Sequence, residues 1–250
     1  MIRNLLLALL LLLPLTCWAE PADLAAVTNS LETPFSRQTP VSQRIRDFQG
    51  EFFQQSHIAS ISRVQHGEGR VRFKFLFQQQ LTPTVMFRWE YSQPEIQEII
   101  SDGQTLWFYL PDNSQVIQSD MSEVNKDGGP NPVTFLSSLG DLGREFSVTW
   151  GEPRLDERGN YRLRLTPRVA SNLVKVMEVV VAKDAVEKGQ QTSENPIFPL
   201  LQTDVTDQQG NRTTIEFVNV KVNPGLPASD FKFTIPPGVE VVKPTEQQTF

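Results

Sequence analysis

Hydrophobic and polar residues alternate along most of the chain after about residue 45. Phe73 and Phe75 alternate with Arg72 and Lys74, and the same period of two recurs over residues 86–91. A period of two places successive side chains on opposite faces of a β-strand. The pattern therefore predicts strands with one apolar face and one mostly polar face.

Short turns that contain glycine separate the predicted strands. Hairpin turns are predicted at Glu68-Gly69, at Asp102-Gly103, and over residues 158–160 and 209–211. Such pairs favour the positive φ that tight hairpins need. With so little helix between the strands, we predict a mostly β fold, either one strongly curved sheet or an incomplete antiparallel β-barrel.

Two segments show helical spacing instead. Residues 22–32 predict an amphipathic helix, and residues 132–140 predict a short apolar helix. Prolines interrupt residues 33–43 and 185–204, which we expect to be an irregular connection and an excursion from the sheet. The two short helices are the only evident helical cover for a broad sheet.

The N-terminus has the pattern of a secretory signal peptide. Arg3 precedes an apolar run over Leu5–Leu13, and Ala19 offers a small residue for cleavage. The run is shorter than the ~20 residues of a membrane-spanning helix. We expect residues 1–19 to be the signal peptide, residues 20–250 to form a single domain, and the protein to be exported to the periplasm of a Gram-negative bacterium.

Cysteine content and charge narrow the functional classes. Cys17 is the only cysteine, so cleavage after Ala19 leaves no thiol for a disulfide, a metal or catalysis. Lipid attachment at Cys17 stays an alternative, although Thr16 and Pro14 do not match the usual lipidation pattern. The net charge of −6 argues against nucleic acid as a partner.

The stretch SDGQTLWFYLPD, residues 101–112, places bulky side chains on both faces of one strand. Leu106 and Phe108 share one face, while Trp107 and Tyr109 share the other. The simpler interpretation is an interior strand packed on both sides. The alternative is that the concentrated aromatic faces exceed what two short helices can cover, and that they line an apolar cavity.

Several segments in order resemble the family of periplasmic outer-membrane lipoprotein carriers, LolA. The resemblance covers nearly the whole mature length and is carried by DFQGEFFQ, MFRWEY, SDGQTLWFYLPD, NPVTFL, YRLRLTP, DVTDQQGNRTTIEF and FKFTIPPGVEVV. It implies an open barrel with a helical lid over a hydrophobic cavity for lipoprotein acyl chains. It also implies loading by an inner-membrane release complex, delivery to an outer-membrane receptor, and no enzymatic activity; we expect a monomer.

Alternation and the resemblance together predict which side chains line the cavity. The expected lining residues are Phe73, Phe75, Phe87, Trp89, Tyr91, Leu106 and Phe108, with Phe135 and Leu136 on the lid.

One departure from the family concerns the control of the lid. Members commonly carry an Arg-Pro pair before the aromatic strand, and the arginine bonds the lid. Here the matching place is Leu81-Thr82-Pro83. Arg72 or Lys74 could replace that arginine only if its face points inward.

Nothing in the sequence indicates catalysis, a cofactor or a metal. No G-x-S-x-G elbow occurs, and we expect His57 and His66 to be surface residues of one hairpin. Asp204, Asp207 and Asn211 suggest a polar turn in preference to a calcium site. The alternatives left open are an outer-membrane-anchored acceptor, a lipid-sensing regulator of the same fold, and a secreted esterase using Ser137 or Ser138.

Overall fold

One sheet organises the chain. The computed structural model describes residues 22–77, 83–124, 134–189 and 196–243. Among these residues the strands are β1 (Asp47–Ile58), β2 (Arg63–Leu76), β3 (Thr84–Gln93), β4 (Gln97–Ser101), β5 (Thr105–Leu110), β6 (Gln115–Asp120), β7 (Phe146–Leu155), β8 (Tyr161–Pro167), β9 (Val176–Val181), β10 (Leu200–Thr206), β11 (Arg212–Val222) and β12 (Glu240–Val242).

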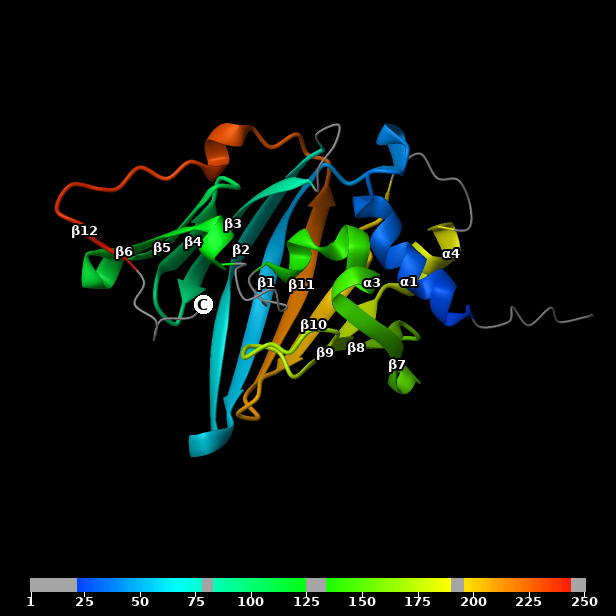
Figure 1. The fold of residues 1–250 in the computed structure, drawn as a ribbon. Coiled ribbons are helices and arrows are strands. Elements are labelled where there is room, and N and C mark those ends of the chain that lie inside the picture. The colour runs from blue at the N-terminus through cyan, green and yellow to red at the C-terminus, as the bar shows by residue number, and fades with distance from the viewer. Residues whose placement is uncertain (1–21, 78–82, 125–133, 190–195, 244–250) are drawn as a thin grey trace, which may run out of the picture.

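The strands form a single open, curved sheet (Figure 1). Their order is β12-β6-β5-β4-β3-β2-β1-β11-β10-β9-β8-β7. Neighbours pair antiparallel except β12, which pairs parallel with β6. The prediction of a mostly β, strongly curved open sheet with few helices is confirmed.

Helices and turns cover the concave face of this sheet (Figure 1). The helix predicted over residues 22–32 is confirmed as α1 (Leu24–Glu32), and the Asp23 side chain caps it by accepting from the Ala26 N–H at 2.7 Å. Val27 and Leu31 on its inner face are fully buried. Helix α4 (Lys183–Gly189) covers the sheet beside α1.

The apolar helix predicted over residues 132–140 is wrong in form. Phe135–Ser137 and Leu139–Asp141 are 3₁₀ turns, and a short helix, α3 (Leu142–Glu145), follows; residues up to 133 lie outside the described part. A Cβ on Gly140 would lie 2.6 Å from the Phe35 carbonyl oxygen. Glycine lowers helix propensity, and packing against the neighbouring segment decides the path of the chain.

The C-terminal segment covers part of the convex face, which we had expected to be mostly polar. The Phe233 ring lies 6.1 Å from Trp107 and 5.3 Å from Tyr109, centroid to centroid. Phe231 is fully buried and packs with Met86 and Leu226. The stretch Leu106–Tyr109 is therefore apolar on both faces because both are packed, which explains its composition.

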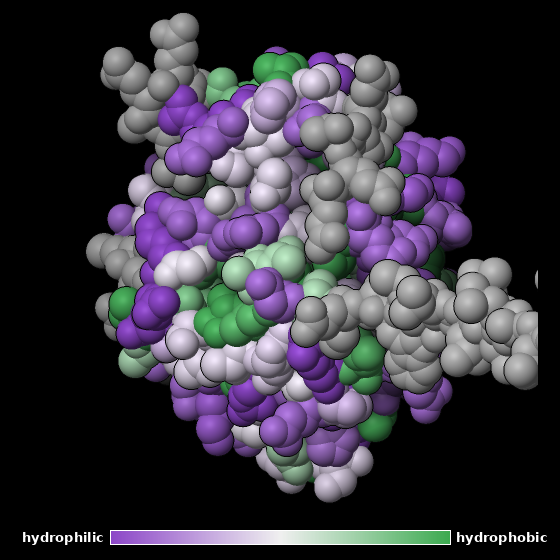
Figure 2. Space-filling model, turned by 90° about the vertical axis from the view of Figure 1, so that its right-hand side faces the viewer, coloured by the Kyte–Doolittle hydropathy of each residue, from purple (hydrophilic) through white to green (hydrophobic). Residues whose placement is uncertain are grey.

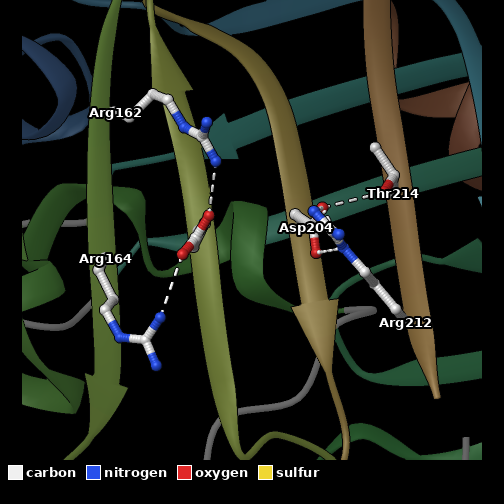
Figure 3. A network of polar contacts seen from close by, with 6 residues as sticks. Arg162, Arg164, Asp204, Arg212 and Thr214 are labelled. Atoms are coloured by element: carbon white, nitrogen blue, oxygen red, sulfur yellow. Dashed lines mark hydrogen bonds and ion pairs between the residues drawn. The ribbon is translucent and has the colours of Figure 1, made fainter. Parts of the chain in front are cut away.

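Charged side chains pair across strands β8 to β11 on the convex face (Figure 3). Arg162 and Arg164 on β8 contact Glu178 on β9 at 2.8 and 3.1 Å. Arg212 on β11 binds both oxygens of Asp204 on β10, and this hydrogen bonding raises the pKa of the arginine. These cross-strand pairs keep that face polar and fix the register of the strands.

Glycine turns occur at three of the four predicted places. Gly103, Gly159 and Gly210 have positive φ. The turn predicted at Glu68-Gly69 is wrong: Gly69 lies inside β2, opposite Tyr91, next to a register shift. A Cβ there would come within 2.0 Å of the Glu90 carbonyl oxygen, so this glycine permits a close backbone approach.

Gly69→Ala tests this close approach. The new methyl must push β3 away, so we expect a loss of about 2–3 kcal/mol in the free energy of unfolding, measured with urea. Gly143→Ala is the control, because nothing lies within 4 Å of its added Cβ. Equal midpoints for the two variants would contradict the role of Gly69.

Arg212→Ala tests the partner of a buried carboxylate. The Asp204 side chain is 7% exposed and would keep only the Thr214 hydroxyl, 3.1 Å away, among these partners. We expect a loss of about 1–2 kcal/mol in urea unfolding, since a hydrogen bond to a charged group is removed. Arg164→Ala should change stability by at most about 0.5 kcal/mol, because Arg162 still contacts Glu178; a larger loss in Arg164→Ala than in Arg212→Ala would refute the assignment.

Candidate functional site

An array of aromatic rings lines the concave face where the central strands meet. Phe73 on β2 lies 5.0 Å from Phe48 on β1 and 5.5 Å from Phe87 on β3, in stacked arrangements. Trp89 on β3 meets Phe52 edge to face at 5.0 Å. Neighbouring strands supply these rings at matching registers, so alternation along each strand becomes a continuous apolar surface across them.

Most of the residues predicted to line a cavity are buried in this array of rings or in the apolar core that continues from it. Those that are at most 5% exposed are Phe73, Phe75, Phe87, Trp89, Leu106, Phe135 and Leu136. Tyr91 and Phe108 are half-buried. The Tyr91 hydroxyl donates to the Gln54 side-chain oxygen at 2.8 Å, and burial raises its pKa to about 12.

An open pocket of about 250 Å³ lies further along the same face, beside β9, β10 and β11. Met177, Val205 and Ile215 provide apolar walls from these strands, and Phe135 and Leu173 add apolar walls from the segments that cross over them. The rim is polar and consists of Asn172, Asp207, Gln209 and Asn211 with the threonines Thr203 and Thr213. An apolar pocket with a polar rim suits a ligand with an apolar tail and a polar head.

Of the residues predicted from sequence to line a cavity, Phe135 alone lines this pocket. The strand residues around it were missed, although the period of two in VMEVVV, residues 176–181, carries the same kind of signal as the aromatic strands. Aliphatic strands are common in every β core, so their sequence does not distinguish a pocket wall from ordinary packing.

The carboxylates near the pocket rim have protein partners. Asp207 accepts from the backbone N–H groups of Gln209 and Asn211 and from the Asn211 side chain, as a turn-forming aspartate does. Asp204 binds Arg212 on the opposite face. The polar turn is therefore the role these residues have, and the described residues contain no group of three His, Cys, Asp or Glu that could hold a metal ion.

Polar contacts join α1 to α3 at one end and to strand β7 of the sheet at the other. Glu32 at the end of α1 accepts from the Gly143 N–H at 3.1 Å, which links α1 to α3. At the other end of α1, the Arg154 guanidinium donates to the Ala22 carbonyl oxygen and lies over the Trp150 ring at 3.7 Å. Between these two ends, α1 buries Val27 and Leu31 in the apolar core beneath it.

Arg72 and Lys74 do not replace the family's lid arginine, because both point to the convex face. Arg72 pairs with Glu90 at 2.5 Å, and Lys74 donates to the Leu226 carbonyl oxygen at 2.7 Å. Even positions of β2 face away from the ring array, which is set by Phe73 and Phe75. Residues 78–82, with Leu81 and Thr82, lie outside the described part.

Neither serine considered for hydrolysis is paired with a histidine in the described residues, and the Ser137 hydroxyl is buried there without a hydrogen-bond partner. His57 and His66 are exposed on the β1–β2 hairpin, as predicted. The Ser138 hydroxyl donates to the Phe135 carbonyl oxygen, which is a local turn contact. In the described helices, no stretch has the length and apolar character needed to cross a membrane.

The side of the molecule that carries α1 and α4 is mainly hydrophilic, with a small apolar patch near its centre (Figure 2). The rings described above are buried beneath this cover. Access to them therefore depends on movement of the cover, while the pocket beside Ile215 is already open.

Known proteins are similar to this chain over most of its length. A family model described as "Outer membrane lipoprotein carrier protein LolA" matches residues 43–234. The "Outer-membrane lipoprotein carrier protein" of Bordetella avium is 31% identical over 157 residues, which are 63% of this chain and 66% of that protein. The protein with the same description from Xanthomonas oryzae pv. oryzae is 30% identical over 182 residues, 72% of this chain and 78% of that protein.

Solved structures are also similar, at low identity. An uncharacterized conserved protein from Thermus thermophilus has 15% identity and a TM-score of 0.48, over 88% of this chain and 98% of that one. A LolA superfamily protein from Nitrosomonas europaea has 14% identity and a TM-score of 0.39, over 84% and 97%. These values are too low to carry a functional argument.

Glu32→Gln tests the link between α1 and α3. Burial raises the pKa of the Glu32 carboxyl above 4.5, against hydrogen bonds from Gly143 and Leu142 that lower it. The folded state thus holds this proton more tightly than the unfolded state, and wild-type stability rises as the pH falls through the raised pKa and levels off below 4.5. Glutamine keeps the acceptor without the charge, so we expect the variant to be the more stable protein near about pH 8 and the difference to shrink on acidification.

Urea midpoints at several pH values measure this difference. Glu32→Ala is the matched control, since it removes the acceptor too and should be about 1 kcal/mol less stable than Glu32→Gln at every pH. If the stability of the wild type increased relative to that of Glu32→Gln as the pH rises, the pH dependence would have the opposite sign and the assignment would be refuted.

Proposed function

Because the chain belongs to the LolA family of outer membrane lipoprotein carriers, we propose that it binds the acyl chains of lipoproteins against the concave face of its sheet. It then carries them across the periplasm from an inner-membrane release complex to an outer-membrane receptor. The observation that carries the proposal is the apolar pocket beside Ile215, continuous with a buried array of aromatic rings and rimmed by polar side chains.

Affinity in this proposal comes from apolar burial. A buried methylene contributes about 0.8 kcal/mol, so a chain enclosed over a few carbons is held firmly without any charge or covalent bond. The open pocket of about 250 Å³ is smaller than the ~300–1,000 Å³ of typical ligand sites. A lipoprotein with several acyl chains therefore requires the covering segments to move outward.

The carrier performs no chemistry on its cargo. Release follows when a receptor offers the acyl chains a more favourable apolar site, so transfer runs downhill and needs no nucleotide. The part of the protein that binds cargo is the concave face of its sheet. Specificity depends on the volume and depth of the apolar space over that face.

Ile215→Glu tests the pocket as the site of acyl binding. Ile215 is half-buried and lines the pocket, so a carboxylate there would be desolvated by an inserted chain. We expect at least a tenfold loss of lipoprotein released from spheroplasts and recovered with the soluble carrier, equivalent to about 1.4 kcal/mol or more.

Phe53→Glu is the control, because Phe53 is 48% exposed on the convex side of β1. It introduces the same charge in place of a larger apolar group. If Ile215→Glu captured lipoprotein as well as Phe53→Glu, the pocket would not be the binding site.

A further inference from the structure

We infer that Phe35 and Phe198 occupy an acyl-chain subsite next to the open pocket, and that Trp89 donates a hydrogen bond to the carbonyl of the ester or amide bound there. The inference rests on the proposed function and assigns the part of the site that determines chain length.

Both phenylalanines belong to the cover and fill space between rings of the sheet. Phe35 ends the 3₁₀ turn Thr33–Phe35, and Phe198 lies in the irregular chain before β10. The Phe198 ring lies 4.6 Å from Phe48, and the Phe35 ring lies 5.2 Å from Phe75. The two cover rings meet edge to face at 6.3 Å, so together they complete a packed layer over the strands.

The subsite adjoins the open pocket along β11. Ile215 lines the pocket, and Phe217, two residues further on the same face, lies 6.2 Å from Phe198. An acyl chain that continued along β11 from Ile215 past Phe217 would thus meet the Phe198 ring. Displacing that ring would lengthen the apolar channel toward Phe48.

A groove lies beside the segment that carries Phe198. It has a volume of about 580 Å³ and is lined by Val41, Ser42, Arg46, Pro196, Val222 and Asn223. Pro196 precedes Phe198 by two residues, and Val222 is the cross-strand neighbour of Phe48. The segment that carries Phe198 therefore borders this groove through Pro196.

Movement of Phe198 costs little in hydrogen bonding. Residues 196–199 form no helix or strand, and the Ala182 N–H donates to the Pro199 carbonyl oxygen at 2.8 Å to close the base of the excursion. The rings beneath, Phe48 and Phe75, belong to paired strands and stay in place. Exchange of a phenyl ring for methylenes replaces one apolar contact by another.

Trp89 supplies an independent sign that this region receives a ligand. It is 5% exposed, and its indole N–H has no acceptor among the described residues. Its ring lies 6.1 Å from Phe217, which contacts Phe198. A buried donor without an acceptor is rare, and the carbonyl of an acyl ester or amide would satisfy it.

Chain-length dependence tests the subsite. Displacement of 1-N-phenylnaphthylamine by monoacylglycerols of about 6 to about 16 carbons gives affinities that rise about fourfold per methylene until the site is full. Phe198→Ala should extend this rise by at least about two methylenes beyond wild type, because the freed volume joins the pocket.

Phe231→Ala is the matched control. Phe231 is also buried but belongs to the C-terminal segment on the convex face, so its removal should leave the plateau at the wild-type length. If Phe198→Ala does not fold, Phe198→Leu should give a smaller extension in the same direction. The subsite would be overturned if affinity stopped rising at the same chain length in wild type and in the Phe198 variant, or if Phe231→Ala extended that length equally. If none of the proteins bound monoacylglycerol, the proposed function itself would be contradicted.

Trp89→Phe tests the carbonyl contact. We expect its affinity for a monoacylglycerol to fall about threefold to tenfold while its affinity for the alkylglycerol ether of equal length stays within about twofold, since the ether lacks the carbonyl. Equal losses for ester and ether would show that Trp89 contributes only ring surface and would remove the hydrogen bond from the inference.

Discussion

Burial of the concave face is the constraint on which the rest of the structure depends. A curved sheet with an aromatic face cannot leave that face in water, because each exposed ring forgoes roughly 1.5–3 kcal/mol. The protein covers it with α1, the turns around Phe135 and the segment that ends at Phe198. An apolar ligand satisfies the same requirement, so cover and cargo compete for one surface.

The two faces of the sheet meet this constraint differently. The concave face is covered by separate short segments, while the convex face is closed by ion pairs and by the C-terminal chain. Lys74 donates to the Leu226 carbonyl oxygen, and Arg72 lies 3.5 Å from Asp230, so charges fasten that chain to the back of the sheet. The convex face is thus held by charged contacts, while an apolar ligand could take the place of the segments that cover the concave face.

The path of the chain explains how such a cover is held. Residues 33–43 are tied by Arg44, whose guanidinium donates to the carbonyl oxygens of Arg37 and Thr39 and lies over the Phe77 ring at 4.3 Å. Glu32 joins α1 to α3, and Ala182 joins the ends of the excursion that carries Phe198. Each segment thus keeps its own shape and buries apolar side chains such as Leu31 and Phe198 in the core beneath it.

Sequence by itself determined the mostly β fold, α1, three hairpin turns and the LolA resemblance, because alternation, helical spacing and ordered motifs are local properties. Gly69 shows the limit of such signals: the same residue type marks a turn or a close strand contact, and only the pairing with β3 distinguishes them. The same holds for Phe73 and Ile215, since alternation gives the face a side chain occupies but not whether the space above it is filled or open. Tertiary structure decided that rings from the cover close the space above Phe48 while the space beside Ile215 stays open, because both depend on contacts between segments far apart in the chain.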